Sequence, residues 1–276
     1  MSVDPLPDFA TSHAEWHKNL EAQRASEYGP LSITAIHWLD AESRELAGLP
    51  GTWSATDDGL ITLTATPADR LAVGDEPVDG TITIGPLTGV ESTIVEWNVE
   101  RENAAHTPIR IQVAARSGKI AVRPHDPAST NRAEYAGTNT FPANPAWVVN
   151  ARYEANPRAG VEVDTAISWG KQHYDSPGRA VFEVDGQEYS LTLFGTDGSN
   201  DLRANFADAT GADLTYPAVR FVGATRIGES TVVIDFNRAV NPPCAYSTNA
   251  TCPFPPPENR LPIRIEAGEL RPGVSL

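Results

Sequence analysis

The densest group of chemically reactive side chains lies in a proline-rich segment between Asn241 and Pro262 and in the residues just before it. Seven of the 22 positions in this segment are proline, a density that works against both a helix and a regular β-ladder. The backbone must follow an extended path with little residual entropy, which fixes where its side chains point. We predict a ligand-binding site built from Asp235, Asn237, Arg238, Cys244, Tyr246, Cys252, Glu258, Asn259 and Arg260.

The two cysteines of the chain, Cys244 and Cys252, both fall in this segment and admit three interpretations. A disulfide between them would contribute about 2 to 3 kcal/mol, but only in an oxidising compartment. A metal site would need distant ligands such as His37 or His125, because the two thiols do not have the C-x-x-C spacing. As ordinary structure, both cysteines would be small buried side chains.

The charged residues of the segment admit an enzymatic and a structural interpretation. In a hydrolase-like enzyme, Glu258 or Asp235 would be the general base. Arg260 or Arg238 would hold an anionic group of the substrate. Tyr246 or Cys244 would act as proton donor or nucleophile. In the structural alternative, Glu258 and Arg260 form an ion pair that pins the loop. If that pair is buried, breaking it should destabilise the fold by about 1 to 3 kcal/mol.

A second candidate site is the loop Arg-Pro-His-Asp-Pro-Ala-Ser-Thr-Asn-Arg at residues 123–132. Binding residues often concentrate on such irregular loops. Arg123 and Arg132 could hold a carboxylate or phosphate in two-pronged contacts, with His125 or Asp126 as acid or base. Arginine–aspartate pairing within the turn explains the same residues as plain structure.

One helix is indicated near the N-terminus, over about residues 9–26. Ser12 and Glu15 have the spacing of a capping box, and apolar residues recur near one face. We expect this helix to lie on the body of the fold.

The same helix carries two imidazoles four residues apart, His13 and His17, which could reach one metal ion from a single face. The order of residues is not that of a zinc protease motif. We expect Trp16 and Leu20 to occupy the buried face and the histidines to remain partly exposed and unliganded. We therefore assign no metal.

From about residue 50 the pattern changes to short alternating runs separated by glycine, proline, aspartate and asparagine, which predict about a dozen strands, the last near 262–266. Asp185-Gly186 is the strongest hairpin signal. So many strands with one helix exclude layouts based on parallel sheets. We predict a mainly β protein, an antiparallel β-sandwich or barrel with an N-terminal α-helix. A single domain over residues 1–276 is expected, with a subdivision near residue 145 as the alternative.

Composition limits the partners. The chain has 276 residues, with 21 Lys and Arg against 36 Asp and Glu, and a net charge of −15, so nucleic acid should be repelled. No window reaches the apolar length of a membrane helix. No secretory signal is evident at the start, so a cytoplasmic location is expected. Nucleotide-binding, nucleophile-elbow and zinc-protease motifs do not occur, so no cofactor is assigned and enzymatic activity is left open.

Residues 235–262 resemble the hallmark D-F-N-R-A-x-N-P-P-C-A-[FY] followed by C-P-x-P-P-x-E-N-R-L-P of domain-of-unknown-function family 1684, a bacterial and archaeal family. The resemblance covers about residues 15–270. One departure is Val219, where the family pattern has a glycine before the arginine. Further blocks that are similar to the family are 29–39, 122–127, 141–153, 176–178, 206–211 and 215–216. The resemblance implies no established activity, substrate or cofactor.

Three function classes fit these observations. We expect a small-molecule-binding protein whose site, near the proline-rich segment, is framed by that segment and the 123–132 loop. The alternatives are the hydrolase-like enzyme described above and a structural or interaction module in which the proline-rich segment packs against a partner. The ligand, the reaction and the oligomeric state are not evident from the sequence.

Overall fold

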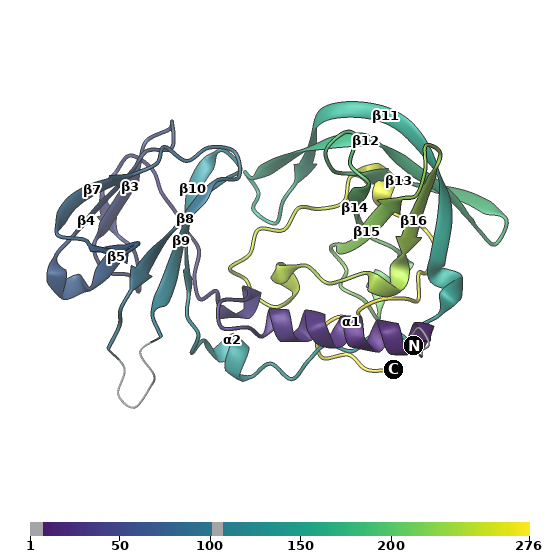
Figure 1. Cartoon of the computed structure of the whole chain (residues 1–276), viewed down its shortest axis with the longest axis horizontal. Coiled ribbons are helices and arrows are strands. Elements are labelled where there is room, and N and C mark those ends of the chain that lie inside the picture. The colour runs from purple at the N-terminus through teal and green to yellow at the C-terminus, as the bar shows by residue number, and fades with distance from the viewer. Residues whose placement is uncertain (1–7, 101–106) are drawn as a thin grey trace, which may run out of the picture. The chain divides into compact units, whose positions relative to one another are not determined.

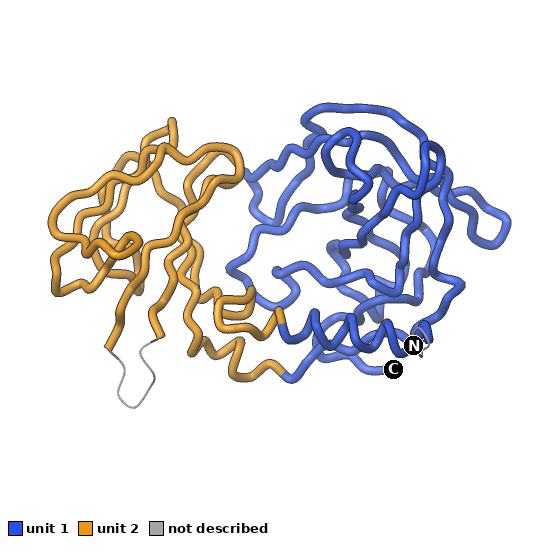
Figure 2. Tube along the Cα trace, viewed as in Figure 1, with its two compact units in different colours: residues 1–22, 136–276 blue, residues 23–135 orange. Residues whose placement is uncertain are grey.

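The computed structural model describes residues 8–100 and 107–276 (Figure 1). The chain forms two compact units, one of residues 23–135 and one of residues 1–22 with 136–276 (Figure 2). We call them the inserted unit and the terminal unit, because the chain leaves and re-enters the second. Whether they behave as one domain stays a prediction.

The inserted unit contains two antiparallel sheets. The first has six strands in the order β1 (His37–Trp38), β10 (Lys119–His125), β9 (Ile109–Arg116), β8 (Ser92–Trp97), β5 (Leu71–Val73) and β6 (Glu76–Pro77). The second has four strands in the order β2 (Arg44–Glu45), β3 (Thr52–Ala55), β4 (Ile61–Ala65) and β7 (Gly80–Ile84). A short helix, α2, spans Thr130–Ala133.

The two sheets of the inserted unit share one hydrophobic core. Trp53 and Ile61 from the four-stranded sheet and Ile111 and Val113 from the six-stranded sheet are fully buried in the same cluster. Along β4, buried and more exposed residues alternate, as the pleat of a strand requires. This arrangement is a β-sandwich.

The terminal unit is built on one six-stranded antiparallel sheet. Its strand order is β13 (Gln187–Leu193), β12 (Lys171–Val184), β11 (Val148–Asp164), β16 (Thr231–Asp235), β15 (Arg220–Arg226) and β14 (Asp201–Phe206). An isolated bridge between Phe194 and Arg203 joins the ends of its two edge strands. No further ladder is described between those edges, so the sheet is not a closed barrel.

The hairpin predicted at Asp185-Gly186 is confirmed. Val184 pairs with Gln187 at the end of the β12–β13 ladder, and both turn residues have positive φ, 52° and 77°. Positive φ at both central positions is the geometry of a type I′ turn, which suits aspartate followed by glycine.

The core of the terminal unit is covered by a long C-terminal segment instead of a second sheet. Phe206, Phe236 and Ile265 are fully buried in one cluster. The sequence predicted a strand at 262–266, and this prediction is wrong. The N–H of Ile265 donates to the Asp208 carboxylate, and the carbonyl of Ile265 accepts from the Arg220 guanidinium. Side chains therefore bind the backbone groups that a neighbouring strand would otherwise pair with.

The N-terminal helix α1 spans Phe9–Arg24 and confirms the predicted helix. Its start differs from the Ser12–Glu15 box: the Asp8 carboxylate accepts the Thr11 N–H at 2.8 Å. Hydrogen bonds from the backbone and the side chain of Thr11 lower the pKa of Asp8. Short 3₁₀ turns follow in the loops, at Pro30–Ser32, Pro67–Asp69, Pro145–Trp147, Ala209–Ala212, Phe236–Arg238, Pro243–Ala245 and Pro257–Asn259.

The predicted fold class is confirmed: the chain is mainly β, its sheets are antiparallel, and it has an N-terminal helix. Among the helices of residues 8–100 and 107–276, none combines the length and apolar character needed to cross a membrane.

Candidate metal centre

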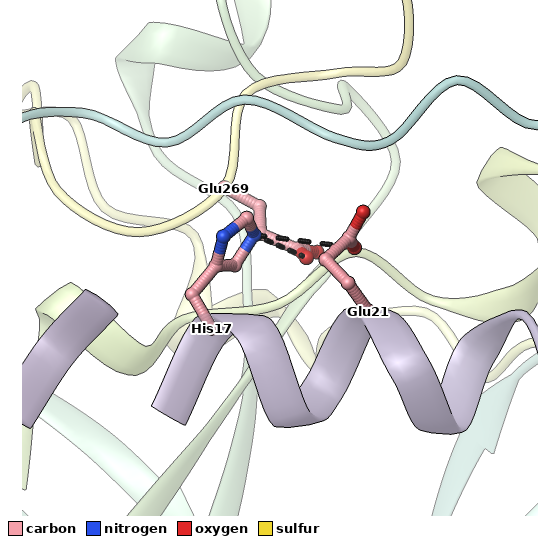
Figure 3. Close-up of side chains that lie close together, drawn as sticks. All are labelled: His17, Glu21 and Glu269. Carbon is pink, nitrogen blue, oxygen red and sulfur yellow. Dashed lines mark ion pairs between the residues drawn. The ribbon is translucent and has the colours of Figure 1, made fainter. Parts of the chain in front are cut away.

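Three side chains of the terminal unit, His17, Glu21 and Glu269, bring metal-ligating atoms together (Figure 3). Nε2 of His17 lies 3.9 Å from Oε1 of Glu21 and 3.7 Å from Oε1 of Glu269. One ligand atom from each residue lies within 4.8 Å of the others. An imidazole with two carboxylates is a donor set that transition-metal ions accept in proteins.

Helix α1 supplies two of the three residues. His17 and Glu21 are four positions apart, so they lie one turn from each other on the same face. Both are half-buried. The spacing therefore aims an imidazole and a carboxylate in one direction.

The buried side of α1 is more polar than the sequence suggested. His13 is only 7% exposed, whereas Trp16 and Leu20 are half-buried, so the expectation that the latter two own the buried face is wrong. The His13 imidazole donates from Nε2 to the backbone carbonyl of Asn237 at 2.9 Å. This hydrogen bond makes burial of the ring acceptable. It also commits that nitrogen to the backbone.

Glu269 is fully buried and held by the backbone around it. Its N–H donates to the carbonyl of Ala239 at 2.9 Å, and the preceding carbonyl, of Gly268, accepts the Phe141 N–H at 2.9 Å. Gly268 has φ +80°, and a Cβ built there would lie 2.5 Å from the Ala239 carbonyl oxygen. Only glycine fits this close crossing, and the crossing sets the position of Glu269.

Each carboxylate of the centre is oriented by a backbone N–H. Oε2 of Glu21 accepts from the N–H of Thr138 at 2.9 Å, and Oε2 of Glu269 accepts from the N–H of Asn241 at 2.7 Å. The other oxygen of each, Oε1, is the one nearest His17. Such outer contacts are how proteins orient metal-ligating carboxylates.

A small polar network continues from Glu269 into the proline-rich segment. The Tyr246 hydroxyl lies 3.4 Å from Oε2 of Glu269 and hydrogen-bonds Oγ1 of Thr138 at 2.9 Å. The Asn241 amide donates to that hydroxyl at 3.3 Å and to the Leu270 carbonyl at 2.7 Å. The network joins the segment to the centre.

Among the described residues, the buried polar atoms without a hydrogen-bond partner include Nε2 of His17 and Oδ1 of Asn241. Asn241 is 4% exposed, and its backbone and side-chain N–H groups both bind the network. Buried polar atoms are normally satisfied. The unpartnered imidazole nitrogen of His17 lies within 3.9 Å of both carboxylates.

A buried ion pair contributes to the electrostatics of Glu269. Arg220 and Asp208 lie 2.8 Å apart with side chains 1% exposed. Burial lowers the pKa of the Arg220 guanidinium, and the charges of Asp208 and Glu269 act against that decrease. The charge of Glu269 therefore has a cationic neighbour as well as the hydrogen bonds described above.

The sequence profile of a family described as protein of unknown function, DUF1684, matches residues 133–270, half of the chain. The chain belongs to this family. A search of curated proteins finds no match. The chain is similar to an uncharacterized protein of Haloarcula marismortui whose solution NMR structure is known, with 26% sequence identity and a TM-score of 0.42. The match covers 50% of the present chain and 78% of the Haloarcula protein.

The start of the DUF1684 hallmark is occupied by structural contacts. Asp235 accepts hydrogen bonds from the Asn237 N–H at 3.0 Å and the Asn237 amide at 2.9 Å, and Arg238 lies 3.4 Å from its other oxygen. Asn237 also hydrogen-bonds the backbone of Asn144. These residues hold a turn, and none is part of the metal-ligating cluster.

The end of the hallmark is likewise structural. Asn259 is fully buried and hydrogen-bonds the backbone of Thr192 and Asn205. The predicted ion pair of Glu258 with Arg260 is wrong, because Glu258 contacts Thr192 and Arg158 while Arg260 is exposed. Residues two apart point the same way on an extended backbone, but Glu258 lies in the 3₁₀ turn Pro257–Asn259 and Arg260 follows it, so the two side chains do not share a side.

The middle of the hallmark contains the two thiols. Cys244 is partly exposed and Cys252 is buried, and the Cys244 N–H donates to Sγ of Cys252 at 3.2 Å. The sequence predicted one site for the whole segment, and the structure brings together three separate groups. Of the predicted residues, Tyr246 contacts the metal-ligating cluster, through Glu269.

The loop 123–132 belongs to the inserted unit. His125 contacts Oγ of Ser32 at 3.0 Å, and Arg132 donates to the carbonyls of Ala25 and Pro127. Arg123 donates a hydrogen bond to the side-chain oxygen of Gln112, and the Asp126 carboxylate accepts one from the Ala128 N–H. These contacts join the four residues to other partners, so they do not show the arginine–aspartate pairing that was predicted within the turn.

Sequence reasoning missed Glu21, Glu269 and Asn241. One signal was present, since His17 and Glu21 have the i, i+4 spacing of a helical ligand pair. Glu269 stands alone in an irregular segment, without a pattern that links it to α1.

Proposed function

We propose that the terminal unit binds one divalent transition-metal ion through Nε2 of His17, Oε1 of Glu21 and Oε1 of Glu269. The observation that carries the proposal is their convergence, with the opposite oxygen of each carboxylate held by a backbone N–H. The proposal departs from the sequence-based expectation of no metal. It gives a specific form to the expected ligand-binding site near the proline-rich segment.

The distances support an ion of ordinary size. Metal bonds of about 2.1 Å to nitrogen and oxygen separate neighbouring ligands by roughly 3.4 Å in a tetrahedral shell. The distances from His17 to the two carboxylates, 3.7 and 3.9 Å, exceed this by a few tenths of an ångström.

The charges also favour a cation. Two carboxylates with ligating oxygens within 4.8 Å of each other repel, and Glu269 is fully buried, where repulsion is weakly screened. A divalent ion would neutralise both. The imidazole selects Zn²⁺, Mn²⁺ or Fe²⁺ over Ca²⁺ and Mg²⁺, which prefer all-oxygen sites.

Three protein ligands would leave at least one coordination position for water or a small molecule. The Tyr246 hydroxyl, 3.4 Å from Oε2 of Glu269, is a suitable polar group for orienting such a molecule. This supports small-molecule binding in preference to the hydrolase based on Glu258 or Asp235, because those carboxylates are engaged in structural contacts.

The proposal is tested by titrating the chelator-treated full chain with Zn²⁺ and Mn²⁺ in a calorimeter, with metal content measured by mass spectrometry. We expect one ion per chain and a rise in the thermal midpoint on binding. His17→Gln and Glu269→Gln should each weaken binding by about tenfold or more. His17 is half-buried, so His17→Gln is the variant that should fold normally.

Matched controls are His173→Gln and Glu15→Gln, which alter exposed residues of the same types in the terminal unit. Both should bind the ion as the unaltered chain does. The proposal is overturned if the unaltered chain binds neither ion stoichiometrically, or if His17→Gln binds as tightly as its His173 control. In that case the three residues form an ordinary ion triad.

We further propose a cytoplasmic location, because a reducing compartment would keep Cys244 and Cys252 as the two thiols of the structure. Fractionation of the source cells, with the chain detected by antibody, tests it. Recovery outside the cytoplasmic fraction would contradict it.

A further inference from the structure

The two cysteines of the terminal unit lie in contact although seven residues separate them. The Cys244 N–H donates to Sγ of Cys252 at 3.2 Å. Both residues are thiols in the structure. The Cys252 sulfur therefore already lies against residue 244 before any bond forms between the two side chains.

The backbone holds both cysteines in place. Cys244 sits in the 3₁₀ turn Pro243–Ala245, and the carbonyl of Cys252 accepts the Ala166 N–H at 3.0 Å. The next residue, Pro253, forms an isolated bridge with Thr165. Because the proline-rich backbone has little freedom, the thiols meet at a high effective concentration.

The environment assigns different roles to the two sulfurs. Cys244 is partly exposed, whereas Cys252 is 3% exposed. The hydrogen bond from Cys252 lowers the pKa of Cys244 to about 7, with a further contribution from Tyr216 and against the effect of burial. Tyr216, whose hydroxyl donates to the Cys244 carbonyl at 3.2 Å, has its own pKa raised by burial and by Cys244.

We propose that Cys244 and Cys252 are a reversible oxidation site, in which Cys244 reacts with a peroxide and Cys252 resolves the product into an intramolecular disulfide. The site uses none of the proposed metal ligands, so it does not depend on the proposed function.

The reaction has two balanced steps. In the first, the Cys244 thiolate attacks one oxygen of hydrogen peroxide; the S–O bond forms, the O–O bond breaks, and the departing hydroxide takes the thiol proton to become water. In the second, the Cys252 sulfur attacks the sulfenic sulfur; the S–S bond forms, the S–O bond breaks, and the hydroxide leaves as water with the Cys252 proton. Two thiols lose two electrons, and one peroxide gains them.

The test treats the full chain with hydrogen peroxide near pH 7, blocks remaining thiols with a maleimide under denaturing conditions, and measures intact and peptide masses. We expect a species that has lost two hydrogen atoms, takes up no maleimide and contains a Cys244–Cys252 linked peptide. Dithiothreitol should restore two reactive thiols. A chain that keeps both thiols, over-oxidises without forming the bond, or links only to a second chain overturns the proposal.

Single substitutions test the two roles. Cys252→Ser should accumulate sulfenic acid at Cys244 that dimedone traps, and Cys252→Ala repeats the measurement if serine is not tolerated at the buried position. Cys244→Ser should leave Cys252 reacting at least about tenfold more slowly. Equal rates at the two sulfurs in these variants would overturn the assignment.

Tyr216→Phe tests the environment of Cys244. Loss of the hydroxyl should raise the pKa of Cys244 and slow its alkylation near pH 7, with the rate of the unaltered chain recovered at alkaline pH, where the thiolate forms in both. The groups that face Cys244 in this measurement are Tyr216 and Cys252. An identical pH profile for the two proteins would contradict the role given to Tyr216.

Discussion

Nε2 of His17 lies 3.7 Å from Oε1 of Glu269, although one residue is in α1 and the other is in the irregular segment after the last strand. The pair meets because the Glu269 backbone is fixed at the crossing with Ala239 and its Oε2 is fixed by the Asn241 N–H. Backbone positions therefore set this contact of the candidate centre.

Gly268→Ala should destabilise the terminal unit by about 1 to 3 kcal/mol, because a side chain at φ +80° is strained and its Cβ would lie 2.5 Å from the Ala239 carbonyl oxygen. Urea denaturation measures the loss. Gly273→Ala is the matched control: its φ is +81° with nothing within 4 Å of the added Cβ, so only about 1 kcal/mol is expected. Equal losses in the two variants would show that the crossing is not tight.

Arg220→Met should reduce the free energy of unfolding by about 3 to 5 kcal/mol, because it leaves the Asp208 carboxylate, 1% exposed, buried without its cation. Arg264→Met is the control, since Arg264 pairs with Asp213 at 3.1 Å with both side chains exposed and should contribute less than about 1 kcal/mol. Chemical denaturation of both variants gives the comparison. A small effect at Arg220 would mean that other groups satisfy Asp208.

The stability of the inserted unit should fall in acid partly through His125. Burial and the charge of Arg123 lower the pKa of this imidazole to about 4, while the unfolded value is near 6.5. Between these values the unfolded chain binds a proton that the folded chain does not, so stability is full above pH 6.5 and declines to pH 4. Denaturation from pH 7.5 to 4.5 should show a shallower decline for His125→Gln. Parallel curves would contradict the assignment.

Asn259→Ala should destabilise the fold by about 2 to 4 kcal/mol, because the buried amide bonds the backbone of Thr192 and Asn205 and its loss leaves those groups unsatisfied. Arg260→Ala should stay within about 0.5 kcal/mol, since its side chain is exposed. Thermal and urea midpoints of the two variants test the contrast. A larger effect at Arg260 would restore the ion-pair interpretation of the hallmark.

The DUF1684 hallmark shows where a sequence pattern and the tertiary contacts differ. The prolines of the DUF1684 hallmark correctly indicated an irregular, rigid segment. Its polar residues were expected to share one hollow, but Asn237 and Asn259 hydrogen-bond the backbone of other segments and Cys244 faces Cys252. A residue type indicates the chemistry a side chain can perform, and it does not indicate whether nearby backbone groups already use it.

The sequence by itself determined the helix near the N-terminus, most strands and their antiparallel pairing, and the Asp185-Gly186 turn, because these depend on periodicities and φ preferences of consecutive residues. Only the tertiary structure placed Glu269 beside His17 and Glu21, and separated the 123–132 loop from the proline-rich segment into another unit. The physical reason is that these meetings depend on where irregular segments cross. Such crossings are fixed by buried hydrogen bonds between distant backbone groups, which leave no period in the chain.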